Sequence, residues 1–237
     1  MHSPSSPEVM TTDMPTPDSI NADFSAKAIV NSPAEPWLPS PSPGVDRRLL
    51  DRVGGEVARA TSIVRYAAGS SFETHAHDHG EEFFVLEGVF SDEHGDYPAG
   101  TYVRNPPGSS HAPRSEGGCT IFVKLRQFAA DDLERVVIDT TATEFSPGRV
   151  PGLTVLPLHE HQGVSTALVK WASGCHFHPH THFGGEEILV LQGVFSDEHG
   201  DYPAGTWLRS PDMSMHTPYT EPGCLIYVKV GHLAAAA

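Results

Sequence analysis

The feature that most constrains the fold of this chain is an internal repeat. A constant step of 105 residues relates the two halves, so that His75 corresponds to His180 and Cys119 to Cys224. The segment 88–101 is identical, residue for residue, to the segment 193–206. A fixed step without insertions predicts a duplicated domain rather than a solenoid of short units.

Each half has the pattern of short strands separated by turns. Runs rich in β-branched and aromatic residues occupy 60–67, 83–90, 101–104 and 119–125, and 91–96 is a turn sequence. Short strands with regular turn signals favour an antiparallel barrel or jelly roll. Only 128–135 suggests one or two helical turns, within a segment that reaches about residue 151 and joins the halves. We therefore predict an all-β protein of two tandem barrels, with domains at 45–135 and 136–237.

The first 44 residues differ from the rest in composition. They are rich in proline, serine and threonine and show almost no apolar periodicity. We expect the first thirty or so residues of this arm, 1–44, to be disordered. Trp37 precedes a proline-rich extended stretch, and we expect it to anchor the arm to the folded body.

The charge balance argues against several classes of partner. The formal net charge is −15, so no basic stripe offsets the charge of nucleic acid or of an anionic membrane. No apolar run approaches the ~20 residues of a membrane-spanning helix, and no secretory signal is visible. Three cysteines without a Cys-x-x-Cys pair argue against a disulfide framework. We expect a cytoplasmic protein that binds neither nucleic acid nor membranes.

The repeat carries residues that suit a metal ion. His75 and His77 are two apart, so in a strand they share a face, and Glu81 follows four residues later. A later strand is needed to supply a fourth ligand. Both halves carry this arrangement, and 15 histidines are more than an ordinary core needs.

The spacing of these residues resembles the cupin family. The residues that match the two cupin motifs in the first half are Gly69, His75, His77, Glu81, Gly88, Gly100, Pro106, Gly108 and His111. Their counterparts in the second half are Gly174, His180, His182, Glu186, Gly193, Gly205, Pro211 and His216. The second half departs from the motif at Met213, which stands where the motif has glycine. This difference predicts a different turn before His216. The asparagine that often ends the second motif is replaced by Ser115 and Thr220.

The resemblance covers about residues 45–232 and implies a metal site in each half. The implied ligands are His75, His77, Glu81 and His111 in the first half, and His180, His182, Glu186 and His216 in the second. Three imidazoles and one carboxylate suit several divalent ions, and the resemblance favours Fe(II), with Zn or Mn as alternatives. Four ligands either close a tetrahedral zinc site or leave two open positions on an octahedral ion.

More narrowly, the segment from Glu81 to Thr101 is similar to the ChrR-type cupins. These domains form the metal-binding part of an anti-sigma factor, also occur alone, and are similar to small cupin dioxygenases that cleave acetylacetone and dihydroxyacetophenone. The resemblance therefore implies an Fe(II)-dependent dioxygenase acting with O2 on a small diketone or hydroxyketone. The alternative is a non-catalytic zinc-binding sensor, although the arm lacks the His-Cys cluster and the amphipathic helix of a sigma-binding region. A homodimer is compatible with either function.

Other polar residues near the motifs have less specific signals. Glu82 and Glu187 alternate away from the site, so we interpret them as solvent-facing. Arg104 and Arg209 suit either a substrate carboxylate or surface ion pairs. The residues with open roles are His79, His94, His199, His176, His178 and Cys175. If their strand is regular, His176 and His178 share a face with His180 and His182, whereas Cys119 and Cys224 are expected in the core.

Overall fold

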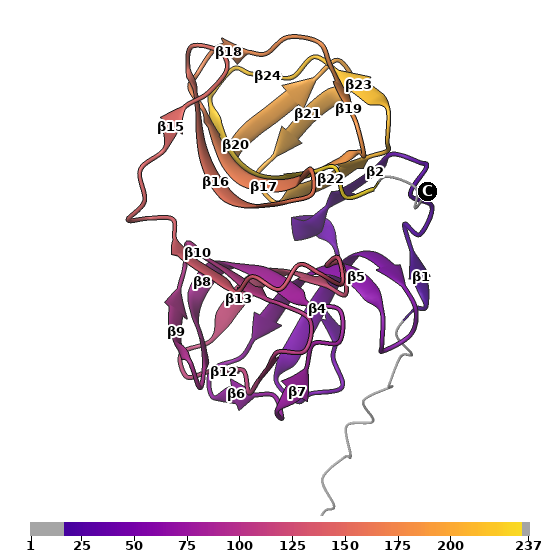
Figure 1. Cartoon of the computed structure of the whole chain (residues 1–237), viewed down its shortest axis with the longest axis vertical. Coiled ribbons are helices and arrows are strands. Elements are labelled where there is room, and N and C mark those ends of the chain that lie inside the picture. Colours follow the sequence, from indigo (N-terminus) through magenta and orange to yellow (C-terminus); the bar gives the residue numbers. More distant parts are fainter. Residues whose placement is uncertain (1–16, 234–237) are drawn as a thin grey trace, which may run out of the picture.

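The computed structural model describes residues 17–233, which form two β-barrels packed face to face (Figure 1). Within these residues the only helical element is the 3-10 turn η1 (Ser32–Ala34). The strands of barrel 1 are β1 (Ser19–Ile20), β3 (Leu38–Pro39), β4 (Val45–Val53), β5 (Arg59–Tyr66), β6 (Ser70–Ser71), β7 (His75–Ala76), β8 (Glu81–Asp92), β9 (Gly95–Pro98), β10 (Thr101–Asn105), β11 (Ser110–His111), β12 (Arg114–Ser115), β13 (Cys119–Leu125) and β14 (Val136–Asp139). The strands of barrel 2 are β2 (Ala28–Asn31), β15 (Ser146–Pro147), β16 (Leu153–His161), β17 (Val164–Trp171), β18 (Cys175–His176), β19 (His180–His182), β20 (Glu186–Asp197), β21 (Gly200–Pro203), β22 (Thr206–Ser210), β23 (Ser214–His216), β24 (Tyr219–Thr220) and β25 (Cys224–Val230). The prediction of an all-β chain with two tandem barrels is confirmed.

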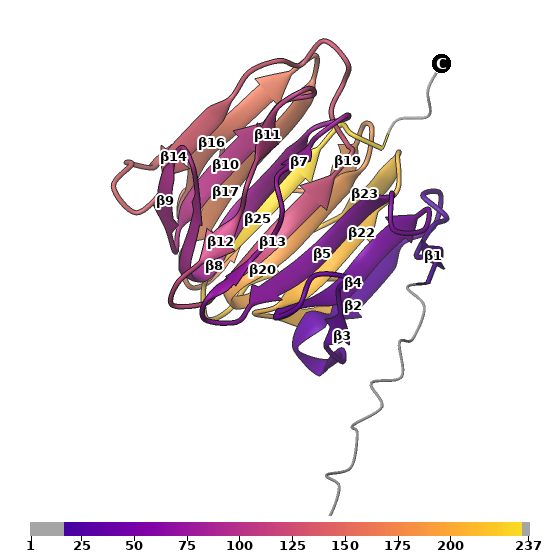
Figure 2. The ribbon, with the colours of Figure 1, turned by 90° about the horizontal axis from the view of Figure 1, so that it is seen from below.

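The two large sheets have the same strand order. In barrel 1 the order is β1-β4-β5-β13-β8-β10-β14, and in barrel 2 it is β15-β16-β17-β25-β20-β22-β2. All of the pairings are antiparallel, and the long strands of one barrel lie over those of the other (Figure 2). Two small sheets, β7–β11 and β19–β23, close the far face of each barrel and carry the candidate ligands His75, His111, His180, His182 and His216.

Each barrel completes its large sheet with a strand from the beginning of the other repeat. The strand β2 pairs with β22 of barrel 2, with Val30 opposite Trp207. Reciprocally, β14 pairs with β10 of barrel 1, with Ile138 opposite Tyr102. The chain thus exchanges one strand between its two barrels, and the indigo strand in the upper barrel of Figure 1 is β2.

This exchange corrects the prediction for the arm. Residues 1–16, where disorder was also expected, lie outside the described residues, but 17–30 contain β1 and β2. The prediction of disorder is wrong for 17–30 because the free edges of β4 and β22 supply backbone partners there. The expected anchor is confirmed: Trp37 packs against the core, and the guanidinium groups of Arg48 and Arg65 lie 4.1 and 4.3 Å from its ring.

The predicted helical turns at 128–135 are also wrong. This segment has only a short turn. Its side chains are held by barrel 1 instead: Asp132 forms an ion pair with the Arg104 guanidinium at 2.7 Å, and the Phe128 ring lies 4.0 Å from the same group. These contacts fix the segment in an irregular path.

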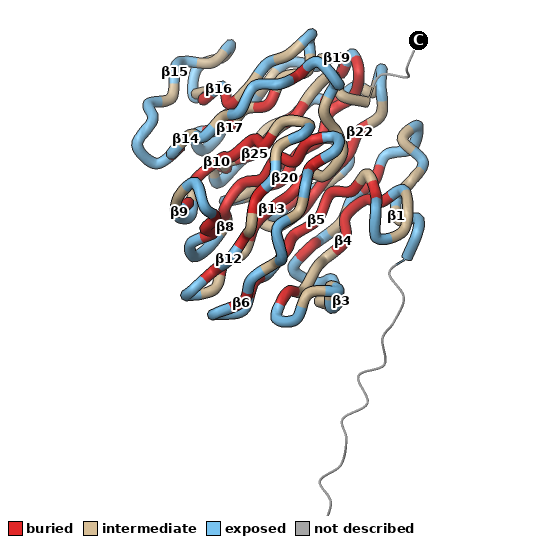
Figure 3. Tube along the Cα trace, turned by 60° about the horizontal axis from the view of Figure 1, so that its bottom comes forward, coloured by how far each residue is buried: buried red, intermediate tan, exposed pale blue. Residues whose placement is uncertain are grey.

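The largest apolar core lies between the barrels. On β8, Phe83 and Val85 point into barrel 1, whereas Phe84 faces barrel 2, as the two-residue period of a strand requires. Leu189 on β20 contributes to the same interface from the other side. The buried tube segments of Figure 3 follow these long strands, while the connecting loops are exposed.

Two reciprocal ion pairs cross this interface. Lys124 of barrel 1 contacts Glu187 of barrel 2 at 2.6 Å, and Lys229 of barrel 2 contacts Glu82 of barrel 1. All four side chains are buried. Glu82 and Glu187 therefore do point away from the metal-binding face, but the prediction that they face solvent is wrong because the second barrel covers them.

The two arginines on the neighbouring strands are buried in the same layer. Arg104 pairs with Asp132 and Glu82, and Arg209 pairs with Asp51 at 3.2 Å. Neither the substrate-binding nor the surface interpretation holds for them, because their guanidinium groups are enclosed and neutralised by these carboxylates.

Within the described residues, no helix is long and apolar enough to cross a membrane.

Candidate metal centres

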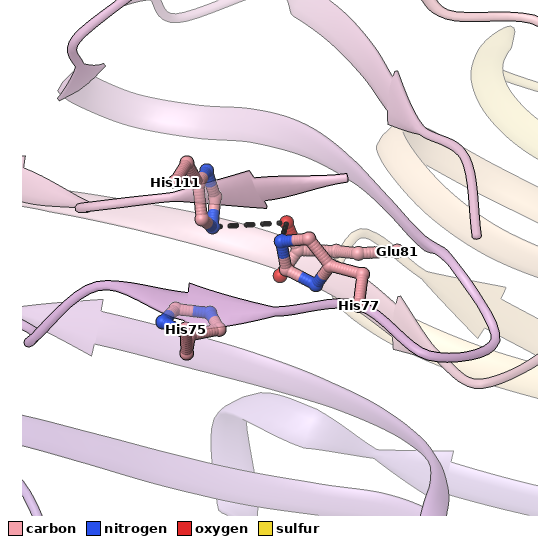
Figure 4. A group of neighbouring side chains, drawn as sticks. All are labelled: His75, His77, Glu81 and His111. Atoms are coloured by element: carbon pink, nitrogen blue, oxygen red, sulfur yellow. Dashed lines mark ion pairs between the residues drawn. The ribbon is translucent and has the colours of Figure 1, made fainter. Parts of the chain in front are cut away.

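The structure brings the four predicted residues of each half together. In barrel 1 the pairing of β7 with β11 sets His75 opposite His111, and His77 and Glu81 follow β7 and begin β8 (Figure 4). Their candidate ligand atoms all lie within 4.8 Å of one another. We call His75, His77, Glu81 and His111 the first quartet.

The four side chains of the first quartet converge on one point. The three imidazole rings have centroids 4.7–5.0 Å apart. The carboxylate oxygen Oε2 of Glu81 lies 3.4 Å from His111 Nε2 and 3.6 Å from His77 Nε2. His75 is the most exposed of the four, and the others are buried, so the centre lies just beneath the surface.

Barrel 2 repeats this geometry. The second quartet consists of His180, His182, Glu186 and His216, and its ligand atoms also lie within 4.8 Å. Glu186 Oε2 is 3.5 Å from His182 Nε2 and 3.7 Å from His216 Nε2. The pairing of β19 with β23 sets His180 opposite His216, as β7 and β11 do in barrel 1.

The outer ring nitrogens of the histidines have hydrogen-bond partners of their own. Nδ1 of His111 lies 3.3 Å from Asp92, and Nδ1 of His216 lies 3.4 Å from Asp197. Nδ1 of His75 and of His180 lies near a backbone carbonyl oxygen, at 3.1 and 3.0 Å. These contacts orient the rings so that Nε2 faces the centre, which is the arrangement seen for metal-ligating histidines.

The quartets fit a metal ion because several of their buried ring nitrogens have no hydrogen-bond partner. Nε2 of His77, His111 and His216 is buried and has no hydrogen-bond partner. Buried polar nitrogens without partners are rare and costly, and a cation that accepts their lone pairs would satisfy them. Nε2 of His182 lies 3.1 Å from Nε2 of His180, a contact that brings two lone-pair donors together.

Burial favours the neutral, ligating form of His77 and His182. Burial lowers the pKa of His77, and burial with the nearby His216 and His180 lowers the pKa of His182 to about 3. These rings are neutral at physiological pH and keep the lone pair that a metal needs. Burial raises the pKa of Glu186 to about 7, so a cation at the centre would stabilise its charged form.

The turn before His216 is the same as its counterpart, contrary to the sequence-based prediction. Met213 has a φ of 62° and Gly108 a φ of 84°, so both lie in the left-handed region. The backbone N–H of Met213 donates to His182 O and that of Gly108 to His77 O, each at 2.9 Å. Met213 therefore keeps the glycine conformation at a cost in backbone strain, and its side chain is exposed.

Most of the other candidate residues lie away from the centres. His94 and His199 are exposed in turns, and His79 is exposed. The condition for aligning four imidazoles, a regular strand, is not met, because the strand is interrupted between β18 and β19. Exposed His176 instead stacks on Tyr219, with ring centroids 5.4 Å apart, and His178 is exposed.

The three cysteines are buried, as predicted for Cys119 and Cys224. Cys175 is also buried, and burial raises its pKa, which opposes the thiolate form that an oxidant sensor requires.

Sequence reasoning missed the residues behind the ligands. Asp92 and Asp197 also accept hydrogen bonds from the hydroxyl groups of Tyr97 and Tyr202, at 3.1 and 2.8 Å. Both aspartate–tyrosine pairs belong to the segment that is identical in the two halves. That identity was the sequence signal that could have pointed to these residues. Asn105 donates to Glu81 Oε2 at 3.1 Å and has no such signal because Ser210 replaces it in the second half.

Two cavities differ in their relation to the quartets. A cavity of about 130 Å³ inside barrel 2 is lined by His180, Glu186 and His216 together with apolar side chains. A larger cavity of about 670 Å³ lies between the barrels, and no member of either quartet lines it.

Comparison with solved structures identifies the fold. A candidate dioxygenase from Nostoc punctiforme matches with a TM-score of 0.74 and 14% identity, covering 90% of this chain and 85% of that one. The bacterial pirin YhhW from Escherichia coli, in complex with nickel(II), matches with a TM-score of 0.64 and 13% identity, covering 86% and 98%. Oxalate decarboxylase from Lactobacillus farciminis, a formate complex, matches with a TM-score of 0.56 and 14% identity, covering 86% of each chain.

The family comparison covers most of the sequence. No curated protein matches the chain. The family model described as the ChrR Cupin-like domain matches twice, over residues 25–129 and 133–234. Each match begins just before an exchanged strand, β2 or β14, so the repeated unit includes the strand that it gives to the other barrel. The chain therefore belongs to the ChrR Cupin-like domain family.

Proposed function

We propose that this chain is a metal-dependent bicupin enzyme that binds one divalent ion at each quartet and acts as an Fe(II)-dependent dioxygenase. The proposed ligands are the residues of the first quartet, His75, His77, Glu81 and His111, and of the second, His180, His182, Glu186 and His216. The observation that carries the proposal is the set of buried Nε2 atoms without partners, gathered around a carboxylate. The fold shared with a candidate dioxygenase supports this reaction class.

The substrate class is a small diketone or hydroxyketone in which a carbon–carbon bond is cleaved with O2. When bound, Fe(II) supplies Lewis acidity and redox chemistry toward O2. The protein contributes imidazoles, a carboxylate and the aspartates that hold His111 and His216 in orientation. The apolar lining of the cavity in barrel 2 limits water around the reacting atoms.

The second candidate is a non-catalytic zinc site. Ligand atoms within 4.8 Å of one another also suit a closed tetrahedral zinc ion. The matching family is described as the ChrR Cupin-like domain, and the ChrR resemblance is what implies a regulatory module of this kind.

Metal analysis and oxygen uptake separate the two candidates. Protein purified without a chelating tag is expected to contain iron at about two per chain and to consume O2 with pentane-2,4-dione. The double substitutions His75→Ala/His77→Ala and His180→Ala/His182→Ala should each remove about one metal, while His94→Ala in an exposed turn should remove none. Tightly held zinc with no O2 uptake would overturn the dioxygenase and favour the zinc module.

A further inference from the structure

The cavity of about 670 Å³ between the barrels belongs to neither quartet. Its volume lies in the range of about 300–1,000 Å³ that is usual for sites of small molecules. Exposed Glu87 and Gln192 contribute to its lining, so the cavity reaches the surface. Most of the other lining side chains are apolar, and they come from the facing strands of both barrels. A ligand in this cavity would therefore contact the two repeats at once.

The lining of this cavity follows the internal repeat. Ser32, just after β2, donates a hydrogen bond to Gly205 O at 2.7 Å, and Thr140, just after β14, donates one to Gly100 O at 2.6 Å. All four residues line the cavity. Because the two barrels build the lining in the same way, a departure from this symmetry marks a position where packing alone does not require the residue.

Arg48 is such a departure. It lies opposite Ile63 of β5, as Leu156 lies opposite Leu168 of β17, so barrel 1 has an arginine where barrel 2 has a leucine. Leu156 is buried in the apolar core between the barrels. Among the described residues that line the cavity, Arg48 is the only cation. The exchange of leucine for arginine therefore gives an apolar cavity one positively charged end.

The guanidinium group of Arg48 has no carboxylate partner within residues 17–233. Its Cζ lies 4.1 Å from the centroid of the Trp37 ring, and its Nη2 donates to Pro33 O at 3.3 Å. Its Nη1 is not enclosed and has no hydrogen-bond partner in the described part of the chain. Burial and the nearby Arg65 lower the pKa of Arg48, and Glu35 offsets only part of this effect. A half-buried cation that no carboxylate neutralises favours an anion brought by a ligand.

From these observations we infer that the cavity between the barrels binds an aliphatic carboxylate, with the carboxylate on Arg48 and the hydrocarbon chain among the apolar side chains of both barrels. Arginine suits a carboxylate because its planar group offers parallel N–H donors. Transfer of the hydrocarbon chain from water to the apolar lining supplies the rest of the affinity. Glu87, the only carboxylate among the described lining residues, forms no ion pair with Arg48 and disfavours a second anion in its own part of the cavity.

The test measures binding to the full-length chain by titration calorimetry, with octanoate and octan-1-ol as probes. The two probes share a chain length and differ in the charge of the head group. Octanoate is expected to bind at one per chain, more tightly than octan-1-ol, and to shift the indole N–H resonance of Trp37 in 15N-labelled protein. Each titration is repeated after chelator treatment, because a carboxylate is also a metal ligand, and the affinity at the cavity should be the same in both preparations.

Variants separate the ion pair from the cavity. Arg48→Leu, which introduces the residue of barrel 2, should weaken octanoate binding by about tenfold and leave octan-1-ol binding unchanged. Arg65→Leu is the matched control and should change neither, because Arg65 also lies against Trp37 but pairs with Asp46 and does not line the cavity. Leu191→Trp fills the cavity and should weaken both probes. If this variant does not fold, Leu191→Phe is a smaller enlargement at the same position.

Equal losses in Arg48→Leu and Arg65→Leu would show that both arginines act only by holding Trp37, and would overturn the assignment of the carboxylate to Arg48. Unchanged binding in the filled variants, or loss of binding on chelation, would overturn the site between the barrels. Failure of both probes to bind would overturn the inference as a whole. These outcomes do not depend on whether the chain holds iron, holds zinc or consumes O2.

Discussion

Asp92 and Asp197 each hold a candidate ligand, His111 or His216, in orientation. Burial opposes the charge of Asp92, but hydrogen bonds from His111, the His94 backbone N–H and Tyr97 hold its pKa below the ordinary value. The carboxylate therefore remains charged and keeps His111 oriented through Nδ1. The same arrangement holds Asp197 behind His216.

Replacing Asp92 should weaken the first centre without removing a ligand. We expect Asp92→Asn to lower metal affinity there by about 10- to 100-fold, because the amide orients the imidazole less firmly. Titration against a competing chelator measures this change. Asp96→Asn, at an exposed position on β9 of the same hairpin, is the matched control, and an equal loss in both variants would contradict the role of Asp92.

Residue spacing predicted that the residues of each quartet would converge, because they lie on local elements with fixed direction. A two-residue period determines that His75 and His77 converge. It also determined that Glu82 points the other way, but not what covers it. The burial of Glu82 depends on Lys229, which is 147 residues away, and no local pattern reports such a contact. The turn at Met213 was mispredicted because the backbone hydrogen bond from Met213 N–H to His182 O fixes the left-handed conformation against the preference of a non-glycine residue.

At the scale of elements, the exchanged strands were the feature least visible in the sequence. The strands predicted correctly, such as β5 and β13, are long and apolar. By contrast, β2 has only four residues and is preceded by a polar, proline-rich stretch. Its stability comes from a partner edge in the second repeat, which composition does not reveal.

The exchanged segments also bring a cation to the opposite barrel. Lys27, just before β2, lies 3.4 Å from both Asp197 and the Tyr202 hydroxyl group. Arg135, just before β14, donates to the Tyr97 hydroxyl group at 3.0 Å. Each exchanged segment therefore places a cation beside the aspartate–tyrosine pair that lies behind the quartet of the other repeat.

Neighbouring positions on β2 should differ sharply in their tolerance to charge. Val30 packs against the core between the barrels, whereas the Ile29 side chain is 50% exposed. We expect Val30→Asp to lower the free energy of unfolding by about 2–3 kcal/mol, because a charge would be buried without a partner. Ile29→Asp should change it by less than about 0.5 kcal/mol. Urea unfolding measures both, and equal effects would show that β2 does not pack as described.

At the scale of the whole molecule, the buried ion pairs tie stability to pH. Burial alone would raise the pKa of Glu82, but Lys229, Arg104 and Lys124 outweigh it and lower the pKa to about 2. The unfolded chain has a value near 4.5, so the unfolded state binds more protons between these two limits. Stability from this pair is therefore complete above about pH 4.5 and is lost as pH falls toward 2.

The expected loss from Glu82 over this range is about 3 kcal/mol. Urea unfolding at a series of pH values from 6 to 2.5 measures it. The double variant Glu82→Gln/Lys229→Met removes both charges together and should give a flatter pH profile, whereas Glu82→Gln alone leaves a buried ammonium group and should destabilise at every pH. An unchanged profile in the double variant would show that the acid sensitivity arises elsewhere.

The reciprocal exchange of β2 and β14 has a consequence for the history of the chain. A single repeat, cut off from its twin, would carry one strand with no sheet to join and one sheet with an unfilled edge. Two such copies would satisfy each other by swapping their first strands. The present protein thus has the architecture of a domain-swapped homodimer whose two subunits are joined in one chain.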